Sequence, residues 1–236
     1  MHRRVDGGAV SGYHVDLTGR FRAALAGCYD ARRAAALSGV PVSTAYYWAR
    51  EQVVVPTVSP TRQKLWSYAD LMALRIVYWL RHPKPVRDSV VPRSPMPQVR
   101  EALDELEQRG LDIWAEDPHE SGTPLLVNID GRVHLGDGWA AGTHGQLSLV
   151  SMLDLLGPFG LGDHHGPDLV RPRPSIRIVP GKVSGEPHLV GSRITTKSVA
   201  ALYRRFGDLS RVAALYPEAA PRTIEQAVDL ENALAA

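Results

Sequence analysis

The apolar positions of the chain recur mostly at the three- and four-residue spacing that is typical of helices. In the first hundred residues this pattern predicts a short helix after Asp30, a second from about Ser43 to Glu51, and a long apolar helix that begins after Ser67. Asp and Ser commonly cap helix N-termini. Gly39 lies between the two short helices and permits a tight turn there. The sequence therefore predicts a compact helical unit near the N-terminus.

The rest of the chain alternates between helical patterns, short β patterns and segments rich in glycine and proline. Asp130-Gly131 is typical of a two-residue hairpin turn, and Pro221 is placed as the first residue of a helix. In chain order we expect a strand, loop and return strand over 53–66, a proline-rich linker over 83–97, a helix over 98–110, a hairpin over 125–138, a short apolar helix over 145–157, a second linker over 159–174, two short strands within 175–195, and helices near 196–206, 209–216 and 221–234.

These elements predict a mainly α protein with small β elements. We expect an N-terminal tail over 1–22, a winged helix-turn-helix over 23–82, a middle α+β segment over 83–166, and a three-helix C-terminal domain with short strands over 167–236.

Composition indicates the cellular compartment and argues against a membrane partner. Cys28 is the only cysteine among 236 residues, which excludes an internal disulfide and favours a reducing, cytoplasmic setting. The N-terminal residues lack the apolar core of a signal peptide, and no apolar run has the roughly 18 residues that a membrane span needs. We therefore expect no membrane partner.

Charge is distributed unevenly along the chain. Residues 20–100 carry 13 Lys/Arg against 4 Asp/Glu, residues 101–166 carry 2 against 12, and residues 167–236 carry 10 against 7. A basic segment beside an acidic one often marks nucleic-acid binding, although two solvated surfaces of opposite sign would give the same count.

The stretch GVPVSTAYYW carries the most specific early signal. Its two short helices have the spacing of a helix-turn-helix, in which the start of the second helix enters the major groove. Ser43 and Thr44 begin that helix, and Tyr46 and Arg50 share one of its faces because they are four residues apart. We expect Trp48 and one of the two tyrosines to be core residues.

From Tyr29 to Leu80 the sequence resembles the DNA-binding domain of MerR-like regulators. The matching features are GVPVSTAYYW, VVVP, and YADLMALRIVYWLR. The resemblance implies that Ser43, Thr44, Tyr46 and Arg50 face operator DNA, and that Arg62 and Lys64 contact the backbone from a wing. The chain lacks the arginine that the family places after the wing proline, and also its long dimerisation helix.

A second motif lies in the C-terminal part. The pattern G-x-P-x-[IL]-x-G-[ST]-R-[IL] is typical of a small domain of bacterial and archaeal antitoxins, and it is matched here by Gly185, Pro187, Leu189, Gly191, Ser192, Arg193 and Ile194, with Tyr216-Pro217 further on. Together the two parts resemble mycobacterial-type VapB antitoxins of type II toxin–antitoxin systems. This resemblance implies a PIN-type ribonuclease toxin as partner, autoregulation of transcription, and no enzymatic activity.

Three arginines of the C-terminal part are candidate toxin contacts, because a guanidinium fits a carboxylate-lined nuclease site. They are Arg193 in the glycine turn, and Arg204 and Arg205 on the first C-terminal helix. The alternative is a second helix-turn-helix with Arg222 and Thr223 at its reading end. The residues predicted for the core of this domain are Leu202, Leu215, Ile224 and Val228.

Other functions are open at this point. The long helix is apolar nearly all round, which predicts a homodimer. A dimeric MerR-like regulator that responds to a small ligand is the alternative to the antitoxin. A metal-dependent hydrolase is a third, through Asp163, His164, His165 and Asp168, but neighbouring side chains in such a loop rarely converge on one ion. We therefore expect no catalytic residue, metal or cofactor.

Overall fold

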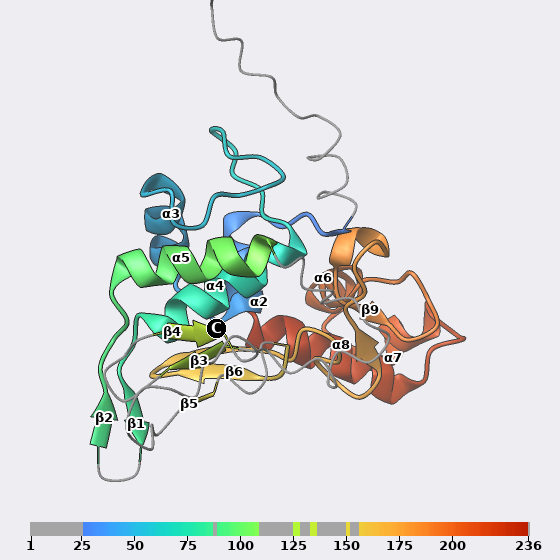
Figure 1. Cartoon of the computed structure of the whole chain (residues 1–236). Helices are drawn as coiled ribbons and strands as arrows, with labels where there is room; N and C mark the ends of the chain where they lie inside the picture. The colour runs from blue at the N-terminus through green and yellow to red at the C-terminus, as the bar shows by residue number, and fades with distance from the viewer. Residues whose placement is uncertain are drawn as a thin grey trace, which may run out of the picture.

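The computed structural model describes residues 26–86, 89–108, 125–127, 133–135, 150–151 and 156–235. This part of the chain is mainly helical, with short antiparallel strands, as the sequence predicts (Figure 1). Its helices are α2 (Ala31–Ser38), α3 (Val42–Arg50), α4 (Tyr68–Leu80), α5 (Met96–Gln108), α6 (Thr196–Phe206), α7 (Leu209–Ala214) and α8 (Pro221–Ala233). Its strands are β1 (Lys84–Val86), β2 (Ser89–Val91), β3 (Leu125–Val127), β4 (Val133–Leu135), β5 (Val150–Ser151), β6 (Phe159–Leu161), β7 (His164–Gly166), β8 (Ile176–Arg177) and β9 (His188–Leu189).

The predicted helix boundaries are set by caps. Asp30 accepts a hydrogen bond from the Arg33 amide at the start of α2, and Gly39 ends that helix in the left-handed conformation. Ser67 and Asp70 form a capping box at the start of α4. In the C-terminal part, Thr195 caps α6, and α7 and α8 begin at the predicted positions.

Three segments differ from the sequence-based expectation. The proline-rich stretch contains the hairpin β1–β2, and the second expected linker contains the hairpin β6–β7, whose tight turn is at Gly162-Asp163. Glycine and proline obscure the short β runs of both segments in the sequence. The short helix expected over 145–157 is wrong at residues 150–151, which pair with β3, while residues 145–149 and 152–155 lie outside the described residues.

Residues 53–66 do not form the expected pair of strands. One isolated antiparallel bridge joins Ser59 to Leu65, and another joins Trp66 to Tyr29 just before α2. Val53 and Val54 instead continue from α3 into the core, where their amides donate to the Trp48 carbonyl. This segment is therefore a loop whose end is fastened to the residues that precede the two short helices.

The largest hydrophobic core surrounds α4. Its buried residues come from α2, α3 and α4, and also from the distant segment 156–178, which contributes Leu156, Phe159, Leu169 and Ile178. This cover from the same chain explains the apolar surface of α4. The sequence-based argument that α4 needs a partner subunit is therefore wrong, and a homodimer stays a prediction without that reason.

A buried arginine fastens segment 156–178 to the helices. Arg75 of α4 is fully buried; its guanidinium donates to the carbonyls of Leu37, Gly157 and Pro167 and lies over the Phe159 ring. Beside it, the turn after α2 meets β7 at backbone distance. A Cβ at Gly39 would lie 2.6 Å from the Gly166 amide nitrogen. The hairpin β6–β7 thus packs directly against the helix-turn-helix turn.

The second core is formed by β8, β9 and α6–α8, which we call the C-terminal unit. Ile176, Val199, Val212, Ile224 and Val228 are among its buried residues. Leu215, expected in this core, is 52% exposed because it lies at the end of α7. Leu234 packs against both cores, and Figure 1 shows α8 running back toward α4. The expected boundary at residue 167 stays a prediction, since Leu169 and Ile178 beyond it belong to the first core.

A buried group of charges joins the two cores. Arg33 of α2 is 6% exposed and Glu231 of α8 is 8% exposed. The Arg33 guanidinium donates to both carboxylate oxygens of Glu231 at 2.8 and 2.9 Å, and to Glu186 at 2.8 and 3.1 Å. Thr196 also donates to Glu231, and Lys197 to Glu186. We call these five residues the Arg33 cluster. Its two cations balance its two carboxylates.

No helix within the described residues is long and apolar enough to cross a membrane.

The Arg33→Met variant should lose about 3–5 kcal/mol of unfolding free energy, because it leaves the buried Glu231 carboxylate without its partner. Chemical denaturation of the full chain measures this loss. Lys197→Met is the matched control: its ammonium is half-exposed, so its loss should cost below about 1 kcal/mol. Equal losses in the two variants would contradict a central role for Arg33.

Lys84 gives a second prediction. It is buried, its ammonium donates to the His82 carbonyl and lies 4.4 Å from the centre of the Trp79 ring, and burial lowers its pKa to about 8. The native state therefore releases this proton before the unfolded state does. Unfolding free energy should rise with pH between about 8 and the ordinary lysine pKa of about 10.4, relative to Lys84→Met. Denaturation curves at pH 7 and 10 test this, and parallel pH profiles would contradict it.

Candidate nucleic-acid interface

Helix α3 divides into a buried face and an outward face. Ala45, Trp48 and Ala49 pack into the first core, as the sequence predicts for Trp48. Ser43 is exposed and Thr44 half-buried at the start of the helix. Pro41 precedes the helix and no side chain caps it. First-turn amides without a side-chain cap are suited to a phosphate oxygen.

The two tyrosines of α3 lie outside the core. Tyr46 is 46% exposed and Tyr47 is 49% exposed, so the expectation that one of them is a core residue is wrong. Small alanines fill the positions that face the core instead. The Tyr46 ring meets Trp66 edge to face at 5.9 Å, which fixes its direction.

Arg50 is held at the end of the same face. Its side chain is 72% exposed; it pairs with Glu51 at 3.3 Å and lies 5.4 Å from the centre of the Tyr47 ring. An exposed pair of this kind is weak, so the guanidinium remains available to an anion. Tyr47 is a functional candidate that the sequence reasoning left out. The three-residue spacing between Tyr47 and Arg50, which brings them together on the helix surface, could have indicated this role.

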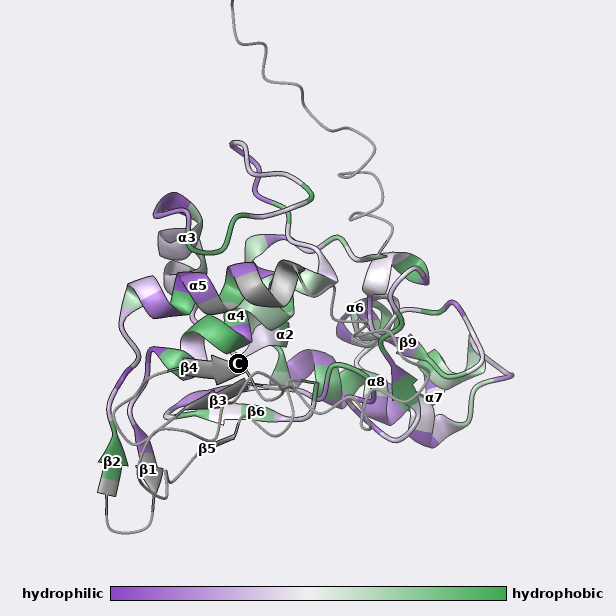
Figure 2. Cartoon of the chain, viewed as in Figure 1, coloured by the Kyte–Doolittle hydropathy of each residue, from purple (hydrophilic) through white to green (hydrophobic). Residues whose placement is uncertain are grey.

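The loop 51–66 follows α3 at the same end of the molecule, and both carry hydrophilic residues on their outer parts (Figure 2). Its base is held by Asp70, which is buried and accepts hydrogen bonds from the amides of Thr57 and Ser67. The Thr57 hydroxyl completes this contact. The loop is therefore fixed at its base by a capping residue of α4.

The tip of this loop carries the two predicted backbone contacts. Arg62 is exposed. Lys64 is half-buried, and its ammonium donates to the Pro60 carbonyl at 3.0 Å. Ser59 orders the tip through hydrogen bonds with the Thr61 hydroxyl and the Gln63 carbonyl. The predicted DNA-facing residues are thus divided between α3 and the loop next to it.

The predicted toxin contacts lie on the surface of the C-terminal unit. Arg193, Arg204 and Arg205 are all exposed. The glycine turn does not need Arg193, because the Ser192 hydroxyl donates to the Leu189 carbonyl and accepts from the Ile194 amide. Arg205 and Arg211 both lie near the Phe206 ring, at 5.8 and 4.4 Å from its centre. The end of α6 and the start of α7 therefore present a basic surface.

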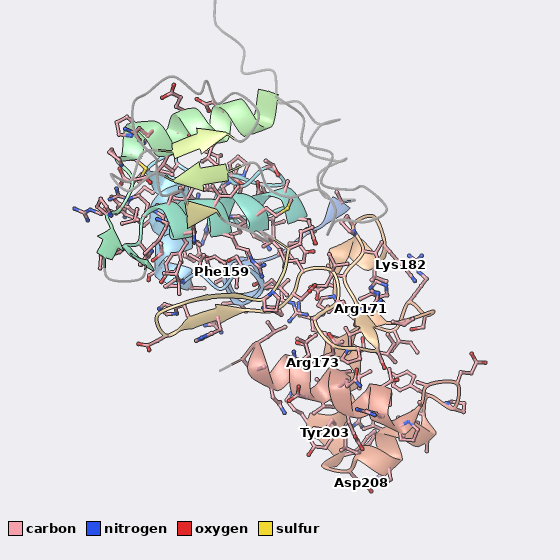
Figure 3. All side chains as sticks on the ribbon, turned by 60° about the horizontal axis from the view of Figure 1, so that its bottom comes forward. Phe159, Arg171, Arg173, Lys182, Tyr203 and Asp208 are labelled. Carbon is pink, nitrogen blue, oxygen red and sulfur yellow. The ribbon has the colours of Figure 1, made fainter. Side chains whose placement is uncertain are left out.

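Acidic residues of the C-terminal unit are largely engaged within the fold. Glu186 and Glu231 belong to the Arg33 cluster, and Asp229 pairs with Arg173 at 2.7 Å. Asp208 caps α7 with its carboxylate. Figure 3 places Asp208 and Tyr203 at the far end of this unit, and Arg173 near its boundary with the first core. The net charge of +3 over 167–236 is therefore expressed mainly by outward-facing arginines.

The outer face of α8 was the alternative DNA-reading surface. Arg222 is exposed at its start, and Thr223 is half-buried. Further along the same helix, Gln226 accepts a hydrogen bond from the Ser175 amide, and Arg173 bonds to Asp229. The segment before β8 thus lies on this face. The exposed acidic residues of α8, Glu225 and Asp229, would repel phosphate.

The histidines of the β6–β7 hairpin are not gathered into a metal site. His164 and His165 are adjacent strand residues and project to opposite sides. His164 lies 6.2 Å from the Tyr78 ring, ring centre to ring centre, and the Asp168 carboxylate accepts from the amides of Val170 and Arg171. Among the described residues, no group of three or more potential ligands is close enough to hold a metal ion.

No family model, curated protein or solved structure matches this chain in the comparisons with known proteins.

Proposed function

We propose that this protein is a VapB-like antitoxin that binds operator DNA through a winged helix-turn-helix and neutralises a PIN-type ribonuclease through its C-terminal unit. The observation that carries the DNA part is the outward face of α3, where Ser43, Tyr46 and Arg50 are exposed above a buried Trp48. The antitoxin part is supported by the glycine–proline–arginine motif and by the exposed arginines of α6.

For DNA binding, α3 is the reading helix and the loop 51–66 is the wing. The first turn of α3 brings Ser43 and Thr44 toward base edges and phosphates, and Arg50 and Tyr46 lie one turn later. Arg62 and Lys64 at the loop tip contact the backbone on the adjoining side. The excess of basic residues over 20–100 supplies the long-range attraction.

For toxin binding, Arg193, Arg204 and Arg205 face the carboxylates that gather around the metal of a PIN-type nuclease. A guanidinium meets a carboxylate through two parallel hydrogen bonds, which favours arginine over lysine in such contacts. Ile224 and Val228 of α8 are buried core residues, as predicted, so they do not contact a partner. Leu215, which follows the end of α7, is an exposed apolar side chain that can contact a partner.

The proposal includes a homodimer, through a surface other than α4. A two-fold dimer would read an inverted-repeat operator with half-sites about one helical turn apart, or a multiple of it.

Affinity for the duplex upstream of the protein's own reading frame should fall steeply with salt, with a slope of about −0.9 for each phosphate contact. The full-length variant Arg50→Ala/Arg62→Ala/Lys64→Ala should bind more weakly and with a shallower slope. Titration of labelled duplex at several salt concentrations measures both quantities.

The matched control is Arg222→Ala/Thr223→Ala on α8, which should bind this duplex like the wild type. If the α8 variant loses affinity and the α3–loop variant keeps it, the reading helix is α8 and the assignment to α3 is wrong.

Replacing Arg204 and Arg205 by glutamate in the full chain should abolish inhibition of the cognate nuclease, because like charges then face its carboxylates. DNA affinity should stay within about twofold, since neither residue belongs to the proposed DNA surface. The reagent is the PIN-type nuclease that this proposal expects to be encoded next to the protein's gene, and cleavage of its RNA substrate is the measurement.

If this variant still inhibits the nuclease, the toxin does not contact α6 through these arginines. A wild-type protein that binds the duplex but inhibits no neighbouring nuclease, and whose DNA affinity changes with a small molecule, would favour the MerR-like regulator instead.

A further inference from the structure

We infer that the C-terminal unit positions the DNA-facing helix pair and loop, through the Arg33 cluster and the contacts of Tyr29. This inference rests on the proposed DNA-binding function and adds positioning residues to it. Arg33 and Tyr29 are buried and lie outside the proposed DNA surface. Both lie within the stretch from Tyr29 to Leu80 that resembles the MerR-like domain, but neither is one of the residues predicted to face DNA.

Tyr29 is the point at which three parts of the protein meet. Its backbone exchanges two hydrogen bonds of 2.9 Å with Trp66, which closes the end of the loop 51–66. Its hydroxyl donates to the Gly185 carbonyl at 2.7 Å in the 3₁₀ turn Val183–Gly185 of the C-terminal unit. Asp30, the next residue, caps α2. One fully buried residue therefore touches the loop, the helix pair and the C-terminal unit.

The close approach at Gly185 leaves no room for adjustment. Gly185 has φ of +74°, and a Cβ there would lie 2.2 Å from the Tyr29 hydroxyl oxygen. The adjacent Cys28 amide donates to the Ser184 carbonyl at 3.1 Å. Residues 28–29 are thus matched to this turn at backbone distance, and the turn sets where α2 begins.

One turn into α2, the Arg33 cluster fixes the geometry of this contact. A buried guanidinium shared by two carboxylates has few alternative geometries, because each oxygen must keep its donor. Burial alone would lower the pKa of Arg33, but hydrogen bonding to Glu231 and the charge of Glu186 outweigh it and raise this pKa. The charged cluster therefore holds α2 in one position against α8.

The consequence concerns the spacing between α3 and the loop. α3 packs on α2, whose position is set by the cluster, and the loop end is fastened to Tyr29. Without the C-terminal unit, segment 27–33 would lose its contacts with Gly185, Glu186 and Glu231 together. The positions of the proposed reading helix and wing relative to each other would then no longer be fixed.

Cys28 is a native reporter of this contact, because it is the only cysteine of the chain. Burial, and then the nearby Glu186 carboxylate, raises the pKa of its thiol. In the intact protein the thiol should therefore react slowly with an aromatic disulfide reagent. Opening the contact removes the burial, so Arg33→Met should be modified about tenfold faster or more, as expected for a local opening.

The experiment uses the full chain at a temperature at which circular dichroism shows every variant folded. Arg33→Lys should lie between wild type and Arg33→Met, because one ammonium cannot serve both carboxylates as a guanidinium does. Arg32→Met, an exposed arginine on the same helix as Arg33, controls for the loss of a charge. Val212→Ala, in the second core, controls for lower stability without damage to the cluster.

DNA affinity is the second readout, measured with the duplex from upstream of the protein's own reading frame. Arg33→Met should bind about tenfold more weakly or worse, because a misplaced reading helix loses contacts to base edges. Val212→Ala should bind like the wild type. This separates positioning from general destabilisation.

Unchanged Cys28 reactivity in Arg33→Met would overturn the inference, and so would equal effects of Val212→Ala and Arg33→Met on either readout. Faster thiol modification with unchanged DNA affinity would also overturn it, since the contact would then not position the DNA surface. A wild-type protein that does not bind the duplex contradicts the proposed DNA function, while the thiol measurement still decides whether the cluster holds segment 27–33.

Discussion

The structure depends on a single buried guanidinium that two distant parts of the chain share. Arg33 lies in the first helix of the N-terminal pair, and its carboxylate partners are 153 and 198 residues further along. A charge with so little exposure is tolerated only where its hydrogen bonds are satisfied. Once that geometry is met, α2 and α8 have one relative position. The turn at Gly185 and the Tyr29 hydroxyl fit only in that position.

A second buried arginine, Arg75, also holds the N-terminal helix pair against residues from the second half of the chain. Arg75 reaches the last turn of α2 and the carbonyls of segment 157–167, while the β6–β7 hairpin presses on the turn at Gly39. The N-terminal helix pair is therefore embedded in residues from the second half of the chain. Its outward face stays free, and the proposed division of function is between surfaces of a joined structure rather than between independent modules.

Much of the local structure was predictable from the sequence, because it depends on near neighbours. Asp30, Gly39, Ser67 and Thr195 set helix ends through caps that need only the adjacent turn. The hairpins at 84–91 and 159–166 were missed because each has three-residue strands, too short for a period to show. Ala45, Trp48 and Ala49 have the i, i+3, i+4 spacing of one helix face, so the exposure of Tyr46 and Tyr47 was predictable from that spacing.

The long-range contacts were not predictable in the same way. Arg33 and Arg75 look like surface arginines in the sequence, since nothing local distinguishes a buried guanidinium from a solvated one. Their partners are backbone carbonyls and carboxylates that only the tertiary fold brings near. The candidate DNA residues on α3 came from a local motif, and the structure places Ser43, Tyr46 and Arg50 on its surface as that motif requires.

Hydrogen exchange across a denaturant series tests most directly whether the two cores form one cooperative structure. The most protected amides of α4 and of α8 should approach a common opening free energy and a common denaturant dependence, because opening either core breaks the Arg33 cluster. The contradictory result is a lower opening free energy for α2–α4 while α6–α8 keep full protection, which would mean that the C-terminal unit is stable without the helix pair.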